Sequence, residues 1–303
     1  METSGIDSVS IIIVNYNAGS MLGDCVEECL KQAGEVIVVD NASSDNSMQI
    51  LESCFSDASR LKLIRNRENL GFAKACNIGS ESATGDYLLY LNPDCLLQKV
   101  CVKNLVSIFD LKPNVAMTGG LLLNPDGTEQ AGGRRAVPTP WRSFVRAFGL
   151  YRFAGRWPTI FFDFYLHLQP IPDEPIEVEA ISGACSMIRR ESMEQLSYWD
   201  EGYFLHCEDL DLCMRVRQKD WKILFVPDAQ IIHHLGLCSR SRPIFVEWHK
   251  HKGMMRFYRK FFRNQYPGVL MWLVAIGVWL RFTSVALYHT MRHIGRWFGF
   301  GRG

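Results

Sequence analysis

The chain has 303 residues, 48% of them hydrophobic and 21% charged, with a formal net charge of +1. This composition excludes the collagen-like, disordered and disulfide-scaffold classes, and the length is sufficient to bury a sizeable core. The charge is unevenly distributed, because residues 240–303 contain twelve Lys and Arg and one acid, a net +11, which leaves −10 for the rest. The C-terminal end is therefore expected to meet an anionic surface.

Cysteine usage and the N-terminus bear on the compartment. The ten cysteines are scattered without a CxxC pair, which favours reduced, packed thiols over disulfides. The first eight residues lack a basic start followed by an apolar run, so we expect no signal peptide and residence in a cytoplasm.

Apolar, β-rich runs alternate with helical patterns through the first half of the chain. Strands are expected at residues 9–14, 35–39, 61–64 and 87–91, and helices at residues 21–32, 47–55, 71–82 and 98–111. This alternation predicts an α/β fold with a doubly wound, mostly parallel sheet flanked by helices. Ligands of such sheets bind at the carboxyl ends of the strands.

The second half is less regular. Residues 119–175 are rich in Gly, Pro, Arg and aromatic residues with weak periodicity, which indicates a long loop or subdomain over the site that could act as a lid. Strands resume at 177–188 and 222–226, with a helix at 208–218 between them. We expect a catalytic domain over residues 1–239 and a separate segment over residues 240–303.

Polar residues follow three of the predicted strands. They are Asn15-Tyr16-Asn17, Asp40-Asn41 and Asn92-Pro93-Asp94, which a parallel sheet would bring to one edge. An acid at a strand end suits Mg²⁺ or Mn²⁺ bridging a diphosphate, which makes Asp94 a candidate ligand. The sequence NPD is also a common turn, so a purely structural role is the alternative.

Other residues of the first half could contact a nucleotide. Asp40 could accept a hydrogen bond from a base imide or a ribose hydroxyl, and Gly71 could allow close backbone approach. Arg134 and Arg135 follow two glycines and could clamp a diphosphate, although paired arginines are usually solvated surface.

The sequence Glu208-Asp209-Leu210-Asp211 places three carboxylates at the start of a predicted helix. Crowded carboxylates raise one another's pKa, which suits a general base for a sugar hydroxyl. A structural alternative is available, because acids favour a helix N-terminus and Asp211 lies four residues before Arg215. His233 follows another strand and could complete a metal site opposite Asp94, or be a satisfied core histidine.

The C-terminal segment combines basic, aromatic and apolar residues. Residues 269–289 have about the length of a membrane span, but Arg281 lies within them, and a central Arg costs roughly 2.5 to 3.5 kcal/mol on insertion scales. An amphipathic helix in the membrane interface fits better, while a single span and an oligomer interface remain alternatives. The adjoining apolar run favours lipid over nucleic acid. The residues expected to face anionic headgroups are Lys250, Lys252, Arg256, Arg259, Lys260 and Arg263.

Eight motifs, in order, resemble the inverting glycosyltransferases of family 2, which have the GT-A fold. They are VSIIIVNYN, VIVVDNASSD, NLGFAKACNIG, DYLLYLNPD, LLLNPDGTEQ, ISGACSMIRR, YFLHCEDLDLCMRVR and VPDAQIIHHLG, which span about residues 9–240. Within that family the chain most resembles the bacterial rhamnosyltransferases that extend lipid-linked O-antigen or cell-wall precursors.

The resemblance implies that Asn15 and Asp40 line the nucleotide pocket, that Asp94 carries the metal and that Asp209 activates the acceptor. With the residue-level reading, the full nucleotide-sugar set is Asn15, Tyr16, Asp40, Asn69, Gly71, Phe72, Asn92, Arg134 and Arg135. The metal set, for Mg²⁺ or Mn²⁺, is Asp94 and His233. The acceptor-side set is Glu208, Asp211, Gly183 and Trp199.

The resemblance also implies substrates and a location. The donor is expected to be a nucleotide-diphosphate sugar, dTDP-rhamnose in this subgroup, and the acceptor a saccharide on a polyprenyl diphosphate at the cytoplasmic face of the bacterial inner membrane. A UDP- or GDP-sugar donor and an inactive membrane-bound scaffold are the alternatives. The chain departs from the family pattern at residues 197–201 and at Cys238, where a Ser is common, which bears on the acceptor more than on the donor.

Overall fold

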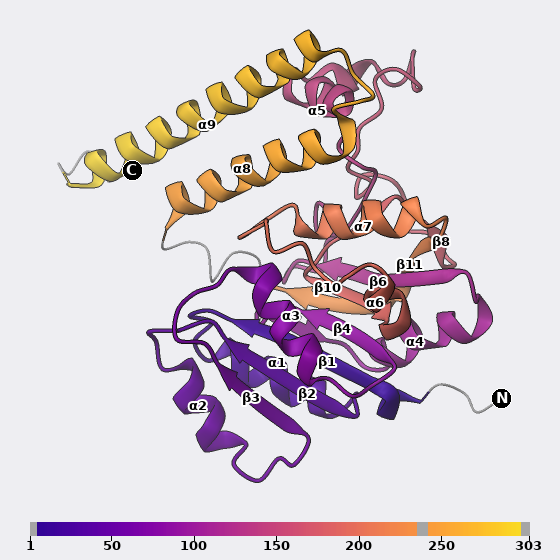
Figure 1. Ribbon diagram of the computed structural model, residues 1–303, viewed down its shortest axis with the longest axis vertical. Coiled ribbons are helices and arrows are strands. Elements are labelled where there is room, and N and C mark those ends of the chain that lie inside the picture. The colour runs from indigo at the N-terminus through magenta and orange to yellow at the C-terminus, as the bar shows by residue number, and fades with distance from the viewer. Residues whose placement is uncertain (1–4, 235–241, 298–303) are drawn as a thin grey trace.

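A computed structural model describes residues 5–234 and 242–297 of the chain (Figure 1). Its centre is a nine-stranded sheet with the order β3-β2-β1-β4-β10-β6-β11-β5, in which β8 also pairs with β11. The strands are β1 (Val9–Asn15), β2 (Glu35–Asp40), β3 (Leu61–Arg65), β4 (Tyr87–Leu91), β5 (Cys95–Leu97), β6 (Val115–Leu123), β8 (Ile176–Glu177), β10 (Cys185–Arg189) and β11 (Lys222–His233).

The sheet is parallel in its first half and mixed in its second. Strands β1, β2, β3 and β4 run parallel, β10 runs antiparallel to both β4 and β6, and β11 runs parallel to β6 but antiparallel to β5 and β8. The predicted doubly wound sheet flanked by helices is confirmed.

Two strand predictions in the second half are wrong in extent. Residues 177–188 form three short strands instead of one, because the chain leaves the sheet at β9 (Ala180–Ile181) to pair with β7 (Arg134–Arg135) before returning as β10. Strand β11 continues past residue 226 to His233, through an irregularity in register between Val226 and Gln230 that contains Pro227. Such a bulge lets a strand tolerate proline.

Helices cover both faces of the sheet. One face carries α1 (Met21–Leu30), α2 (Ser47–Cys54) and α4 (Cys101–Leu111), and the other carries α3 (Phe72–Ser82), α6 (Arg190–Gln195) and α7 (Glu208–Gln218). In β1, Ile11 and Ile13 pack on the first face, while Ile12 and Val14 pack on the second. Burial of each such side chain contributes about 1.5–3 kcal/mol, so this β-branched run fixes β1 at the centre.

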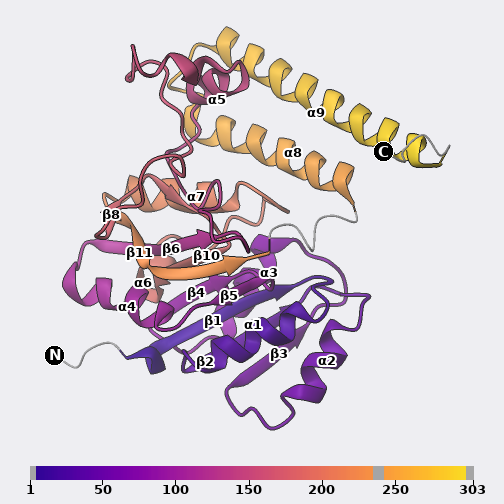
Figure 2. The same cartoon turned by 180° about the vertical axis from the view of Figure 1, so that it is seen from behind.

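The C-terminal segment is a pair of long helices, α8 (Pro243–Phe262) and α9 (Gly268–Trp297). Helix α8 lies over α7, and α9 packs against α8 on the side away from the sheet (Figures 1 and 2). The rings of Trp248 and Trp279 meet at 5.2 Å between the two helices. Residues Gly268–Arg292 are long and apolar enough to cross a membrane by length and composition, and only 6% of the apolar window is buried. The predicted domain boundary near residue 239 lies outside the described residues, as does Cys238.

The region predicted as a loop or lid contains α5 (Pro140–Ala147) and the short 3₁₀ helix η2 (Leu150–Phe153). Helix α5 begins where Thr139 accepts a hydrogen bond from the Arg142 amide and Pro140 takes the first helical position. Tyr258 of α8 donates to Ser143 of α5 at 2.7 Å. In both views α5 lies beside the start of α9, farther from the sheet than α7 and α8, so it does not cover the strand ends (Figures 1 and 2).

Four charged residues join α8 to the catalytic domain, and we call them the clasp: Asp200, Asp211, Arg256 and Lys260. Arg256 donates to both carboxylate oxygens of Asp200 at 2.8 and 2.9 Å, and Lys260 lies 2.7 Å from Asp200 and 2.6 Å from Asp211. Burial alone would raise the pKa of Asp200, but hydrogen bonds from Lys260 and Arg256 outweigh it and lower that pKa to about 2. The prediction that these basic residues face lipid headgroups is therefore wrong for Arg256 and Lys260.

Candidate active site

The ends of β1 and β2 meet through a buried hydrogen bond, because the two strands pair in register with Asn15 opposite Asp40. The Asn15 side-chain amide donates to Asp40 at 2.8 Å and to the hydroxyls of Ser43 and Ser47 at 3.0 and 2.9 Å. Asn15 is fully buried, and Asp40 is 5% exposed. The sequence prediction that both lie at one sheet edge is met, with Tyr16 half-buried beside them.

A second amide network ties the edge of the sheet to the start of α3. Asn41 donates to the Asn69 side chain at 3.0 Å and to the carbonyl of Gly71 at 3.1 Å. Gly71 has φ +87°, and a Cβ there would lie 2.6 Å from the carbonyl oxygen of Phe204. The need for glycine at this position therefore arises from the protein's own loop, whereas the sequence suggested approach to a nucleotide.

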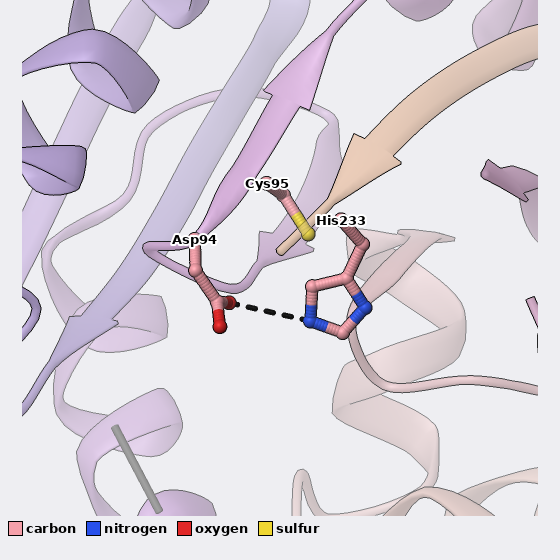
Figure 3. A group of neighbouring side chains, drawn as sticks. All are labelled: Asp94, Cys95 and His233. Atoms are coloured by element: carbon pink, nitrogen blue, oxygen red, sulfur yellow. Dashed lines mark ion pairs between the residues drawn. The ribbon is translucent and has the colours of Figure 1, made fainter. Parts of the chain in front are cut away.

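Asp94, Cys95 and His233 offer ligand atoms that all lie within 4.8 Å of one another (Figure 3). Asn92-Pro93-Asp94 forms the turn between β4 and β5, and the antiparallel pairing of β5 with β11 sets His233 opposite Cys95. An Asp94 carboxylate oxygen and His233 Nε2 are 3.3 Å apart, and each residue is 4% exposed. Two ligands of one hard divalent cation, each bound at about 2.1 Å, would stand at about this separation.

Gln130 fixes the orientation of the His233 ring. Its amide nitrogen donates to the carbonyl of His233 at 3.3 Å and to Asn124 at 3.1 Å, so its oxygen is the atom that faces His233 Nδ1 at 2.6 Å. Nδ1 therefore donates to Gln130, and in the neutral imidazole Nε2 then keeps a lone pair on the side of Asp94. Metal-ligating histidines commonly have such a partner on the other ring nitrogen. The donor set fits a divalent cation.

Asp209 opens the first turn of α7 and is held by two donors. One carboxylate oxygen accepts from the guanidinium of Arg135 and from the backbone amide of Gly183, the latter at 3.2 Å. Burial alone would lower the pKa of Arg135, but the charge of Asp209 outweighs it and raises that pKa. The other oxygen accepts from the Leu210 amide at 2.7 Å. Asp209 keeps 15% of its side chain exposed, so an acceptor hydroxyl can reach it.

Residues Gly183 and Ala184 contact both the Asn92-Pro93-Asp94 turn and Asp209. Gly183 donates its amide to Asp209, and a Cβ on Gly183 would lie 3.2 Å from the Cβ of Asp209. The carbonyl of Ala184 accepts from the Asn92 amide at 2.9 Å and from the Cys95 thiol at 3.5 Å. Adjacent Cα atoms are about 3.8 Å apart, so the candidate base and the turn that carries Asp94 contact the same dipeptide.

Glu208 is 7% exposed, and its Oε2 is buried with no hydrogen-bond partner among the residues that the structure describes. Burial, and then the charge of Asp209, raise the pKa of Glu208 to about 8. The predicted crowding of carboxylates therefore raises the pKa of Glu208, which favours its protonated acid at neutral pH.

The raised pKa of Glu208 predicts a pH-dependent stability. Unfolding restores an ordinary pKa near 4.5, so between about pH 4.5 and 8 the unfolded chain releases a proton that the folded protein retains, and stability falls as pH rises. We expect Glu208→Gln to remove this decline and to raise the free energy of unfolding at pH 9 by on the order of a few kcal/mol. Urea unfolding at pH 5, 7 and 9 measures it. Glu81→Gln, at an exposed position, is the matched control and should follow the unaltered protein. Parallel pH curves for all three proteins would contradict the assignment.

Three predicted site residues lie elsewhere or serve the fold, and a fourth, Phe72, packs its ring against one of them. Arg134 is 2% exposed and is held by Glu129 and by two backbone carbonyls, so it is not free to clamp a diphosphate. Trp199 is 2% exposed in the core, with its ring edge-on to Tyr90 and Phe72. This placement removes Trp199 from the acceptor side and gives the ring of Phe72 a packing role.

Asp211 is the third, because it is fully buried between Arg215 at 2.6 Å and Lys260. The structural alternative named for it, an ion pair one helical turn away, is met.

The loop before Glu208 contacts α3 on one side and α8 on the other. His206 and Cys207 have φ of +68° and +71°, which non-glycine residues rarely adopt. A Cβ on Gly253 of α8 would lie 2.7 Å from the carbonyl oxygen of His206, just as one on Gly71 would meet Phe204. The start of α7 is thus positioned by both α3 and α8.

Sequence reasoning missed Gln130 and Cys95, and it gave Arg135 a different role. Gln130 lies within the quoted LLLNPDGTEQ motif, but nothing local marks it as a partner of His233, which is 103 residues away. Arg135 pairs with Asp209 across 74 residues, where the sequence suggested contact with the donor diphosphate.

Comparisons with known proteins identify the family and the fold of the chain. The model of glycosyl transferase family 2 matches residues 10–197, and that of glycosyltransferase-like family 2 matches residues 171–255. An N-acetylglucosaminyl-diphospho-decaprenol L-rhamnosyltransferase of Mycobacterium tuberculosis is 25% identical over 243 residues, which cover 75% of this chain and 76% of that protein.

A second relative and a solved structure extend the comparison. The low-salt glycan biosynthesis hexosyltransferase Agl10 of Haloferax volcanii is 25% identical over 241 residues, 77% of this chain and 69% of that protein. The structure of the mannosyltransferase PcManGT of Pyrobaculum calidifontis, in complex with GDP-Man and Mn²⁺, superposes with a TM-score of 0.57 at 15% identity, over 95% of this chain and 80% of that one. The predicted GT-A fold is confirmed.

Proposed function

Because this chain belongs to glycosyltransferase family 2, we propose that it transfers a sugar, with inversion, from a nucleotide diphosphate to a saccharide carried on a polyprenyl diphosphate. The observation that carries the proposal is the dipeptide Gly183-Ala184. It joins Asp209, a carboxylate suited to deprotonate an acceptor, to the turn that carries Asp94, one member of the Asp–His pair suited to hold a divalent cation.

The proposed reaction is a single in-line displacement. Asp209 takes the proton of the acceptor hydroxyl on the oxygen that does not bind Arg135, and the hydroxyl oxygen bonds to the anomeric carbon as the bond to the diphosphate breaks. A divalent cation held by Asp94 and His233 would offset the charge of the departing diphosphate. Arg135 holds the carboxylate of Asp209 in its orientation. No covalent sugar intermediate is required.

The donor side is proposed from the strand ends. Asn15, Asp40 and Asn69 form a hydrogen-bonded edge that suits a nucleoside, and Asn92 stands beside the cation pair. We propose L-rhamnose as the sugar, since the mycobacterial relative carries rhamnosyl transfer in its name, with dTDP as the nucleotide from the sequence resemblance. A UDP- or GDP-sugar is the second candidate, favoured by the GDP-Man in the superposed mannosyltransferase.

The experiment that tests the function is a donor screen. The purified protein is incubated with dTDP-rhamnose, GDP-mannose and several UDP-sugars, with Mg²⁺ or Mn²⁺ and an N-acetylglucosaminyl diphosphate lipid. We expect acceptor-dependent release of nucleotide diphosphate with one donor, fastest with dTDP-rhamnose. Binding of a donor without release under every condition would identify an inactive scaffold instead.

We also propose that the protein sits on the cytoplasmic face of the bacterial inner membrane, where nucleotide sugars and lipid-linked acceptors meet. Helix α9 supports this location, because Trp272 is 65% and Leu280 62% exposed on an apolar helix that packs against α8. Aromatic and aliphatic side chains of this kind insert at the headgroup boundary.

Neutral substitutions on α9 test the membrane contact. We expect the double change Trp272→Gln and Leu280→Gln to weaken binding to vesicles with one-third phosphatidylglycerol by at least about tenfold, since two large apolar side chains no longer insert. Co-sedimentation measures it. Leu111→Gln, at a 74% exposed position on α4, is the matched control and should bind as the unaltered protein does. Equal binding by all three would place the membrane contact elsewhere.

A further inference from the structure

A pocket of about 430 Å³ lies between the α5 segment and the turn that joins α8 to α9. This volume falls in the range of small-molecule sites, about 300–1,000 Å³. The function proposed above gives it no role. The lining residues that matter here are Trp141, Arg142, Thr159, Ile160, Phe162 and Tyr266.

The strongest hydrogen-bond donors of this lining are already engaged within the protein. The indole N–H of Trp141 donates to the carbonyl of Ile160 at 2.8 Å. Arg142 donates to both carboxylate oxygens of Glu179 at 2.6 and 3.1 Å, and its guanidinium stands 5.2 Å over the ring of Phe162. The pocket thus offers rings and aliphatic surface to a ligand, which suits a hydrocarbon chain better than a sugar or a phosphate.

The pocket lies beside the first residues of the apolar helix α9. Tyr266 immediately precedes Pro267 and the start of α9, and α5 stands beside that start in both views (Figures 1 and 2). Phe144 and Trp157, close to the lining residues in sequence, are 45% and 46% exposed. The pocket therefore lies next to the start of α9, and exposed aromatic side chains belong to the same α5 segment.

The inner wall of the pocket leads back to Asp209 along a short stretch of chain. Glu179, the partner of Arg142, lies four residues before Gly183, whose amide binds Asp209. Four residues span at most about 14 Å even when fully extended. Arg135, the other partner of Asp209, lies six residues before Trp141. These two short connections, from Glu179 to Gly183 and from Trp141 to Arg135, place the pocket within reach of a molecule whose sugar occupies the active site.

We propose that this pocket binds the isoprenyl chain of the lipid-linked acceptor, with the chain entering from the membrane surface at α9 and the diphosphate and sugar directed toward Asp209. The inference rests on the proposed function and deepens it, because it assigns a subsite for the carrier lipid. Acceptor recognition then has two parts, a hydrocarbon subsite at α5 and a sugar subsite at Asp209.

The first test fills the pocket and compares two acceptors. Thr159→Trp adds bulk to the lining, and Leu168→Trp adds the same residue at a 73% exposed position outside it. Each protein is assayed with N-acetylglucosaminyl diphosphate carried on a farnesyl chain or on a methyl group. We expect Thr159→Trp to lower kcat/KM for the farnesyl acceptor by at least about tenfold and to leave the methyl acceptor unchanged, because only the former buries isoprene units. Equal losses with both acceptors, or none, would overturn the proposal.

The second test needs no transfer and so separates this proposal from the proposed function. Binding of farnesol, which has no diphosphate, is measured by equilibrium dialysis. We expect the unaltered protein and Leu168→Trp to bind it and Thr159→Trp to bind at least about tenfold more weakly, even if no donor supports turnover. Unchanged farnesol binding in Thr159→Trp would refute the pocket. Loss of vesicle binding in Thr159→Trp, with the acceptor preference intact, would assign the pocket to a bilayer acyl chain and equally refute it.

Discussion

Asp209→Asn is expected to lower kcat by about 10²- to 10⁴-fold, the usual loss when a general base is removed. The amide retains a carbonyl oxygen for the Gly183 amide and for Arg135, so the local geometry is kept while the proton acceptor is lost. Initial rates of nucleotide diphosphate release measure the effect. The dissociation constant of the donor should be nearly unchanged, because Asp209 faces the acceptor.

A folding control is needed, since Arg135 would lose its only charged partner among the described residues. Leaving a buried charge unpaired destabilises by about 3–5 kcal/mol. Rates are therefore compared at a temperature where circular dichroism shows the variant folded, and Asp57→Asn, an exposed acid-to-amide change, serves as the matched control. Near-normal turnover by folded Asp209→Asn would show that another group accepts the proton of the acceptor hydroxyl.

Removal of the divalent cation is expected to have the second large effect. Chelation should abolish transfer reversibly, and Asp94→Asn should lower kcat/KM by on the order of 10²-fold or more, because the charge of the leaving diphosphate is then poorly offset. Activity as a function of Mn²⁺ concentration measures both. Activity that persists in chelator would show that the Asp94–His233 pair serves the fold and not a cation.

Gln130→Leu refines that experiment. The glutamine touches the far nitrogen of His233 and keeps its proton there, so its loss should weaken metal affinity by about 10- to 100-fold while saturating Mn²⁺ restores most of the rate. Asn124→Ala is a suitable comparison, because Asn124 holds the same amide one step farther away. An irreversible loss in Gln130→Leu would indicate a structural role.

The strand ends could be predicted from the sequence because their signals are local. Strand β1 is apolar except for Ser10 and ends at Asn15, and β2 is apolar after Glu35 and ends at Asp40. Parallel pairing then brings the two terminal polar residues together without further information. Helix α7 was predicted with its observed bounds, since its apolar positions repeat with helical spacing after a cluster of acids.

The contacts that complete the site could not be predicted, because they join distant segments through tertiary packing. Arg135 reaches Asp209 across 74 residues, and Gln130 reaches His233 across 103. Neither leaves a periodic or compositional trace. The sequence indicated that both arginines could contact the diphosphate. Only the structure shows that Arg134 is buried and bonded to Glu129, whereas Arg135 binds Asp209.

The wrong predictions for basic and aromatic residues have a common physical cause. The charge or aromatic character of a residue does not reveal whether its side chain faces the solvent or the protein interior. Arg256 and Lys260 are as basic as their neighbours on α8, but they form ion pairs with Asp200 and Asp211 within the protein. Trp199 lies in residues 197–201, a segment that the sequence placed near the acceptor, but its ring packs against Tyr90 and Phe72.

The clasp has a mechanical consequence. Lys260 joins α8 to the first turn of α7, the same turn that presents Asp209, so the helical hairpin and the base move as one body. A surface that holds α9 thereby sets the height of Asp209 above that surface. In the proposed function, this fixed height would favour acceptors whose reactive hydroxyl stands at the same distance from the membrane.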